Sequence, residues 1–87
     1  MNFNIVDLKK KIIYRSTYRG TKEMDSLLAS FTKKYINTFK DKELIFLYNL
    51  LDIDDDNLYK FNQNKPISIK IEINKVSELF KNFKLGD

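Results

Sequence analysis

A short polar stretch in the first third of the chain has the residue types of a recognition site. Arg19, Gly20 and Glu23 place a guanidinium, a backbone without a side chain and a carboxylate within five residues. Glycine lets another backbone approach closely, and the helix dipole favours a carboxylate in the first turn of a helix. Arg15 and Thr21 add a second guanidinium and a hydroxyl. The stretch is therefore a candidate surface for binding a partner.

The same residues also have an ordinary structural interpretation. Gly20 can end one helix while Glu23 caps the next. Arg19 can form a surface ion pair that contributes less than about 1 kcal/mol. From the residues alone, the structural and functional interpretations have equal weight.

The chain lacks the side chains of most familiar catalytic sites. It has no cysteine and no histidine, which removes Cys/His zinc sites, thiol nucleophiles and the usual general base with a pKa near neutrality. Paired carboxylates could act as acid and base, but the aspartates at 52 and 54–56 precede a predicted helix beside water, where nothing raises a pKa. We therefore expect no catalytic residue, and a protein that is not an enzyme.

The acidic run also fails as a calcium-binding loop. An EF-hand loop that began at Asp52 would need Gly at its sixth position and Glu at its twelfth, where this chain has Asn57 and Gln63. Helix capping and solvation explain the run, so no metal site is predicted.

Positive charge is concentrated in the first half of the chain. Residues 1–42 carry ten Lys/Arg and four Asp/Glu, a net charge of +6, whereas residues 43–87 have a net charge of −2. The electrostatic field of the positively charged half attracts an acidic protein, a nucleic acid or an anionic membrane. Tyr14 and Tyr18 alternate with Arg15 and Arg19, as in some nucleic-acid-binding surfaces, but no recognised binding signature is present. A basic nucleic-acid-binding module is therefore an alternative function, as is an antitoxin-like regulator of another protein, while the main expectation is no nucleic acid.

The length of 87 residues favours one small domain over residues 1–87. The chain has no run of about 18 apolar residues, which a helix that spans a bilayer needs. Its first residues do not have the pattern of a secretion signal. The abundance of Asn, Lys and Ile suggests AT-rich coding and a bacterial source. We expect a cytoplasmic bacterial protein without membrane insertion.

Five segments have apolar residues at the three- and four-residue spacing of amphipathic helices. They run from Ile5 to Tyr18, from after Gly20 to Tyr35, from Asp41 to Leu51, across Leu58 to Phe61, and from Val76 to near Gly86. The sequence therefore predicts an all-α bundle of about five short helices.

Several details of this bundle are predicted as well. Ile13 is expected on the buried face of the first helix, and Asp41 is expected to cap the third helix, which is apolar nearly all round. Residues 62–74 are expected to form a loop and an extended segment packed across the bundle. Residues 1–4 and 85–87 are expected to fray.

The stretch around Gly20 resembles the Arg-Gly-x-x-Glu motif of the succinate dehydrogenase assembly factor family. These small helical proteins promote covalent flavinylation of the flavoprotein subunit of the dehydrogenase. Arg19, Gly20 and Glu23 fill the motif. The likeness covers roughly residues 8–66 and includes Leu27, Leu28, Phe31, Leu50, Leu51, Asp52, Asp55, Leu58, Tyr59, Lys65 and Pro66.

Three positions depart from the family pattern. Phe61 stands where the family usually has Trp, Asp54 lies where a Pro is frequent, and Tyr18 stands where another basic residue is common. Phe61 keeps an aromatic ring for packing, whereas Tyr18 removes a positive charge beside the motif.

The resemblance implies a five-helix bundle that binds the flavoprotein subunit of succinate dehydrogenase, with fumarate reductase as a further candidate. It implies that binding promotes attachment of FAD to a histidine of that subunit. The implied partner-binding residues are Arg15, Arg19, Gly20, Thr21 and Glu23. The chain is expected to be a monomeric assembly chaperone that holds no stable cofactor and acts on the FAD of its partner.

Overall fold

All regular secondary structure within residues 4–86, the part of the chain that the computed structural model describes, is helical. The five helices are α1 (Ile5–Thr17), α2 (Lys22–Tyr35), α3 (Asp41–Leu50), α4 (Asp55–Asn62) and α5 (Lys75–Asn82). The prediction of a small all-α fold with five short helices is therefore confirmed.

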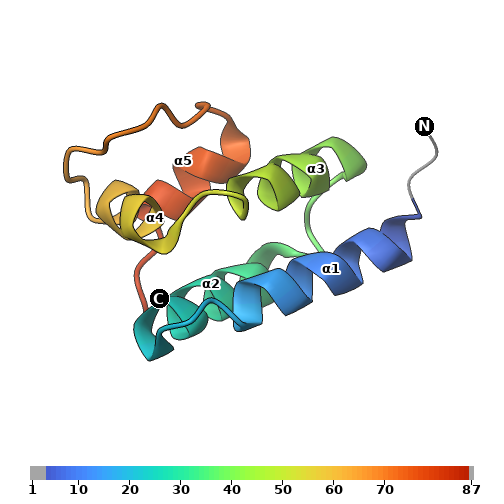
Figure 1. Cartoon of the computed structure of the whole chain (residues 1–87). Coiled ribbons are helices and arrows are strands. Elements are labelled where there is room, and N and C mark those ends of the chain that lie inside the picture. The colour runs from blue at the N-terminus through green and yellow to red at the C-terminus, as the bar shows by residue number, and fades with distance from the viewer. Residues whose placement is uncertain (1–3, 87) are drawn as a thin grey trace.

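Helices α1 and α2 form an antiparallel pair that is joined by a short turn (Figure 1). The three shorter helices lie against this pair, with α3 contacting α1 and α5 contacting both α3 and α4. Lys84 and Leu85 line a surface pocket together with Glu23 in the first turn of α2, and Arg19 in the α1–α2 connection pairs with Asp55 at the start of α4. The fold thus places segments that are far apart in the sequence around the start of α2.

Side-chain caps begin most of these helices. Asn4 accepts hydrogen bonds from the amides of Val6 at 3.0 Å and Asp7 at 3.3 Å, and Thr21 accepts one from the amide of Met24 at 3.2 Å. Such bonds satisfy amides that have no partner inside the helix. Asp54 and Asn74 cap α4 and α5 in the same way.

The start of α3 differs from the prediction. Lys40 occupies the capping position, and Glu43 accepts a hydrogen bond from the Lys40 amide at 2.8 Å. The prediction that Asp41 caps this helix was wrong, because Asp41 is its first helical residue. There its carboxylate still lies near the positive end of the helix dipole.

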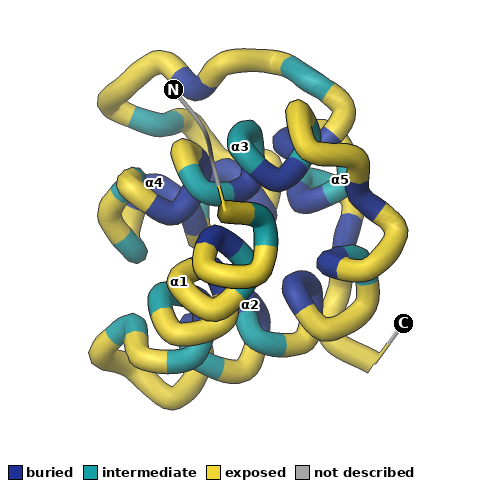
Figure 2. Tube along the Cα trace, turned by 90° about the vertical axis from the view of Figure 1, so that its right-hand side faces the viewer, coloured by how far each residue is buried: buried dark blue, intermediate teal, exposed yellow. Residues whose placement is uncertain are grey.

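The buried apolar side chains form one cluster, to which all five helices contribute (Figure 2). Phe31 of α2 is fully buried, and its ring meets those of Phe80 and Phe83 edge-on at centroid distances of 5.3 and 5.4 Å. Ile12 is fully buried, but Ile13 is 50% exposed, so its predicted core position was wrong. The side chains of two adjacent helical residues point in directions about 100° apart around the helix axis. Here only Ile12 faces the neighbouring helices.

The segment between α4 and α5, residues 63–74, contains neither helix nor strand. Ile71 is buried in the core and Ile67 packs partly against it, whereas Ile73 is 63% exposed. Asn57 holds the segment by accepting hydrogen bonds from the Ser68 amide at 3.2 Å and its hydroxyl at 3.3 Å. The expected extended segment is present, but alternate isoleucines do not all face the core.

The predictions for the two ends of the chain also need correction. Helix α5 ends at Asn82, earlier than the predicted end near Gly86, and Phe83 has an extended backbone that turns its ring into the core. Asn4 caps α1. The expected fraying of residues 1–3 and 87 lies outside the described residues.

Stability is expected to fall in acid, partly through two capping carboxylates. The amide of Lys40 and the ammonium of Lys75 lower the pKa of Glu43 below its usual 4.5, and hydrogen bonds from Asn57 lower the pKa of Asp54 below its usual 3.8. A carboxyl whose pKa is lower in the folded state stabilises the fold above its unfolded pKa, and this stabilisation is lost as the pH falls through the folded pKa. Melting curves between about pH 6 and pH 3 should show this loss.

The double substitution Glu43→Gln with Asp54→Asn keeps oxygen acceptors at both caps but removes the titration. We expect the variant to have a shallower dependence of melting temperature on pH below about pH 5. An unchanged pH dependence would mean that other carboxylates cause the acid destabilisation.

Candidate functional site

The connection between α1 and α2 (residues 18–21), termed the Gly20 turn, is the most exposed part of the candidate site. Gly20 has φ +115°, and a Cβ built on it would have no atom within 4 Å. The backbone here needs glycine for its conformation, because side chains disfavour positive φ. The empty space around Gly20 leaves its backbone open to an approaching molecule.

Arg19 ties this turn to the connection between α3 and α4. Its Nε donates to Asp55 Oδ1 at 2.8 Å, and the pair is largely buried, with side-chain exposures of 11% for Arg19 and 26% for Asp55. Its two other nitrogens donate to the carbonyl oxygens of Leu51 at 2.8 Å and Ile53 at 2.7 Å. Arg19 is therefore a bridge between two parts of the chain, and the idea of a weak surface ion pair was wrong.

Arg15 makes a similar, more exposed connection one helical turn earlier. Its guanidinium donates to the Asp52 carboxylate and to the Leu51 carbonyl oxygen, the latter at 3.2 Å. It also lies over the ring of Tyr48, 4.9 Å from the centroid. We call the set of contacts made by Arg15 and Arg19 with residues 51–55 the arginine clamp. Both guanidinium groups that were expected to face a partner are bonded within the chain.

The Gly20 turn is also fixed from the side of α2. Asp25 accepts a hydrogen bond from the Arg19 amide at 2.5 Å, while Thr21 caps the helix. The arginine clamp, the Asp25 carboxylate and the Thr21 cap together hold the backbone on both sides of Gly20. A turn held in this way loses little conformational freedom when a partner binds.

Glu23 lies in the first turn of α2, as predicted, and its side chain is exposed. Within residues 4–86 it forms no ion pair. It borders a surface pocket of about 200 Å³, the Glu23 pocket, which is lined by Glu23, Leu27, Tyr59, Asn62, Gln63, Lys84 and Leu85. The pocket thus joins the first helical turn of α2 to the end of α4 and the C-terminal residues.

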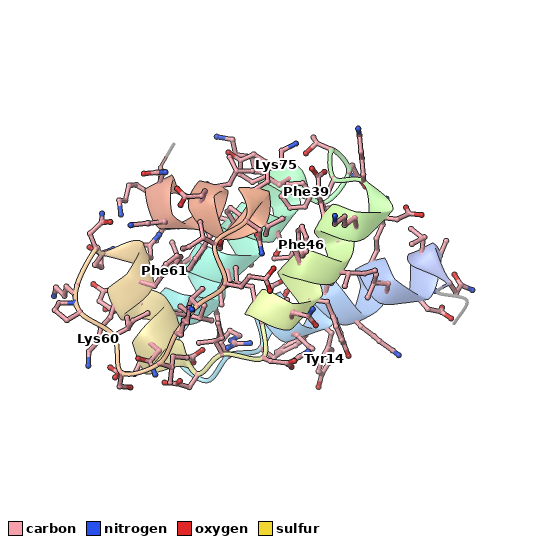
Figure 3. The ribbon with its side chains drawn as sticks, turned by 90° about the horizontal axis from the view of Figure 1, so that it is seen from above. Tyr14, Phe39, Phe46, Lys60, Phe61 and Lys75 are labelled. Carbon is pink, nitrogen blue, oxygen red and sulfur yellow. The ribbon has the colours of Figure 1, made fainter. Side chains whose placement is uncertain are left out.

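Two tyrosines lie beside the Gly20 turn. Tyr14 and Tyr18 are 65% and 69% exposed, and their rings contact each other with a centroid separation of 4.9 Å. Figure 3 shows Tyr14 at the edge of the bundle, away from its interior. The tyrosines remain accessible for stacking, but the arginines that a nucleic-acid surface would also need are bonded to Asp52 and Asp55.

No group of three or more acidic, histidine or cysteine side chains within residues 4–86 is arranged to hold a metal ion. Asp54 caps α4, while Asp52 and Asp55 pair with the arginines. In the same described part of the chain, no helix has the length and apolar character needed to cross a membrane.

The aspartates of the arginine clamp were missed as partners from the sequence. A usable signal was present, because Arg15 and Arg19 lie one helical turn apart and Asp52 and Asp55 are three residues apart. Two matching pairs of opposite charge suggest that the segments meet.

Comparison with known proteins identifies the family. A family model described as the flavinator of succinate dehydrogenase matches residues 10–84, which include the arginine clamp, the Gly20 turn and the Glu23 pocket up to Lys84. This match spans most of the chain. The chain belongs to this family. The resemblance seen in the motif around Gly20 is therefore confirmed.

Named relatives agree with the family match. The chain is 39% identical over 74 residues to the FAD assembly factor SdhE of Wigglesworthia glossinidia brevipalpis, an alignment that covers 78% of this chain and 88% of that protein. It is 43% identical over 51 residues to the mitochondrial succinate dehydrogenase assembly factor 2 of Scheffersomyces stipitis, covering 59% of this chain and 34% of that protein. The comparison with solved structures gave no significant match.

Proposed function

We propose that this chain is a non-catalytic assembly factor that binds the flavoprotein subunit of succinate dehydrogenase and promotes covalent attachment of FAD to a histidine of that subunit. The observation that carries the proposal is the family match over residues 10–84, which includes an exposed, internally fixed Gly20 turn. A relative described as an FAD assembly factor supports the same function. The flavin and the histidine belong to the partner, so the chain itself needs no redox or nucleophilic side chain.

The proposed docking surface consists of Gly20, Thr21 and Glu23. Gly20 presents open backbone, Thr21 fixes the start of α2, and Glu23 presents a carboxylate. Arg15 and Arg19 belong to the site as positioning residues, because their guanidinium groups hold the turn against residues 51–55. We propose that the arginines are needed for the shape of the surface more than for direct contact with the partner.

Binding promotes flavinylation only if it discriminates between arrangements of the partner. A protein that bound every arrangement of the flavoprotein subunit equally would not change their populations. We propose that the docking surface binds the arrangement in which the histidine and the flavin are placed for reaction. A fixed turn suits this role, because a flexible turn would adapt to several arrangements.

We also propose that the protein acts as a monomer in the bacterial cytoplasm and holds no FAD of its own. The bacterial relative, which the chain covers over 88% of its length, supports this setting. Fumarate reductase is a second candidate client.

Glu23→Ala is expected to weaken binding to the flavoprotein subunit without lowering the melting temperature appreciably. Thr21, not Glu23, provides the side-chain cap of α2, so the loss of the carboxylate removes only a dipole contribution of about 0.3–1 kcal/mol from the fold. Titration calorimetry with the purified apo subunit and a melting curve would measure both effects.

Glu78→Ala is the matched control, because Glu78 is also an exposed glutamate in the first turn of a helix, α5. It should leave binding unchanged. A large fall in melting temperature for Glu23→Ala, with binding retained, would mean that Glu23 stabilises the helix and does not contact the partner.

The function itself is tested by reconstitution. Purified apo flavoprotein subunit is incubated with FAD in the presence or absence of this chain, and intact-protein mass spectrometry measures the fraction that has gained one covalent flavin. A higher rate with the chain present is expected. An equal rate, under conditions where the subunit does bind the chain, would argue against a role in flavin attachment.

A further inference from the structure

We infer that the Glu23 pocket receives a basic side chain, arginine or lysine, of the flavoprotein subunit. This inference rests on the proposed function and specifies what the partner must present beside the Gly20 turn.

The pocket has the size and the walls for a side chain with an apolar stem. Its volume of about 200 Å³ is several times the roughly 30 Å³ that one water occupies in the liquid. Leu27 is buried at 5% exposure, while Tyr59 and Leu85 are 39% and 53% exposed on the pocket lining. Arginine and lysine place their methylene groups along such apolar surfaces and keep the charged end at a polar group.

Asn62 and its neighbours already use most of the hydrogen-bonding capacity of the pocket. The buried Asn62 amide nitrogen donates to the carbonyl oxygens of Phe80 at 2.8 Å and Phe83 at 2.7 Å. The Asn62 side-chain oxygen accepts from Gln63 at 2.8 Å, and its backbone oxygen accepts from Lys84. These groups already form hydrogen bonds within the chain, and most of these bonds hold α4 against the end of α5 and the residues after it.

Glu23 is different, because its carboxylate forms no ion pair with residues 4–86. A carboxylate only accepts hydrogen bonds, and its strongest partners are guanidinium and ammonium groups. Lys84 also lines the pocket, but its ammonium donates to the last residue of α4, where helix carbonyl groups attract positive charge. The group that complements this pocket is therefore a cation from another molecule.

The position of the pocket makes the flavoprotein subunit the source of that cation. Glu23 is three residues from Gly20, so a partner backbone lying on the Gly20 turn has side chains within reach of the pocket. Tyr59 adds an aromatic ring to the pocket lining, and guanidinium groups pack favourably against such rings. One partner segment can thus contact both features.

The test measures the affinity of the purified apo flavoprotein subunit for three versions of this chain. Glu23→Gln keeps the shape of the side chain and removes its charge, so affinity should fall about tenfold, the value of one charge-assisted hydrogen bond. Glu23→Lys should reduce affinity about a hundredfold or more, because it places like charges together. Glu78→Gln, at an exposed position in α5, should bind as the parent does.

A second measurement finds the partner residue. A photoreactive benzophenone side chain at position 85, on the rim of the pocket, is cross-linked to the subunit, and the captured peptide is identified by mass spectrometry. The peptide should contain an arginine or lysine whose replacement by glutamate weakens binding to the parent chain. Combining that partner substitution with Glu23→Arg should restore binding.

The outcomes separate this inference from the proposed function. If Glu23→Gln binds as tightly as the parent while Gly20→Arg does not bind, the docking surface stands and the cation pocket is wrong. A captured peptide without a basic residue, or no restoration by the charge exchange, would also overturn the inference. If the parent chain itself does not bind the subunit, both the inference and the proposed function fail.

Discussion

Gly20→Arg is expected to abolish binding to the flavoprotein subunit while the bundle remains folded. The Gly20 turn offers open backbone, with no atom within 4 Å of a Cβ at this position. An arginine side chain there would hold an approaching partner away and leave polar groups unpaired at the contact. Binding should become undetectable by calorimetry under conditions in which the parent binds.

The fold should tolerate this substitution, because the added side chain meets no atoms of the protein itself. The cost is the backbone strain of a non-glycine residue at φ +115°, about 1–2 kcal/mol. A domain of this size has a total stability of about 5–15 kcal/mol. Circular dichroism should therefore show a helical protein whose melting temperature is lower by several degrees.

One control separates strain from obstruction. Gly20→Ala imposes the strain with a small side chain and should weaken binding less than Gly20→Arg does. An unfolded Gly20→Arg protein would mean that Gly20 is needed for folding and would leave no evidence that it contacts the partner.

Arg19→Ala is expected to cause the largest loss of stability of any single change in the site. The substitution leaves the carboxylate of Asp55 and the carbonyl oxygen of Ile53 without their arginine donor, and Leu51 keeps only the longer hydrogen bond from Arg15. Removing one partner of a largely buried, hydrogen-bonded pair costs about 3 kcal/mol or more. In a domain of this length such a loss lowers the melting temperature by more than about 10 °C.

Arg15→Ala is the comparison for this prediction. Its side chain is 29% exposed and its partner Asp52 is 64% exposed, so solvent screens the pair and the loss should be about 1 kcal/mol. Arg19→Lys should resemble Arg19→Ala, because a single ammonium cannot reproduce the three directions of the guanidinium bonds. If Arg19→Ala melts like the parent but fails to bind, Arg19 contacts the partner directly and the arginine clamp is not its main role.

Helix positions in this chain could be predicted because they depend on local patterns. The spacing of Leu27, Leu28 and Phe31 identifies one face of α2, and all three are buried. Gly20 between two periodic segments identified the connection between α1 and α2. The errors at Asp41 and Ile13 are shifts of one residue within elements that were correctly placed, because neighbouring positions compete for a cap or a core-facing direction.

The arginine clamp was not predicted, because it joins Arg19 to Leu51, Ile53 and Asp55, which lie 32, 34 and 36 positions further along the chain. Those contacts depend on the path between α3 and α4, and local periodicity does not determine that path. The motif around Gly20 identified the family correctly, yet it gave no distinction between side chains that face outward and side chains that fix the turn. That distinction requires the three-dimensional structure.

The central claim is that this chain promotes flavin attachment through the Gly20 turn. It is tested most directly by in-gel fluorescence of covalent flavin on the cognate flavoprotein subunit after denaturing electrophoresis. The subunit is expressed alone, with the parent chain, with Gly20→Ala and with Gly20→Arg. We predict strong fluorescence with the parent, a smaller loss with Gly20→Ala than with Gly20→Arg, and little fluorescence with Gly20→Arg or without the chain. Equal fluorescence in all four lanes would contradict the account.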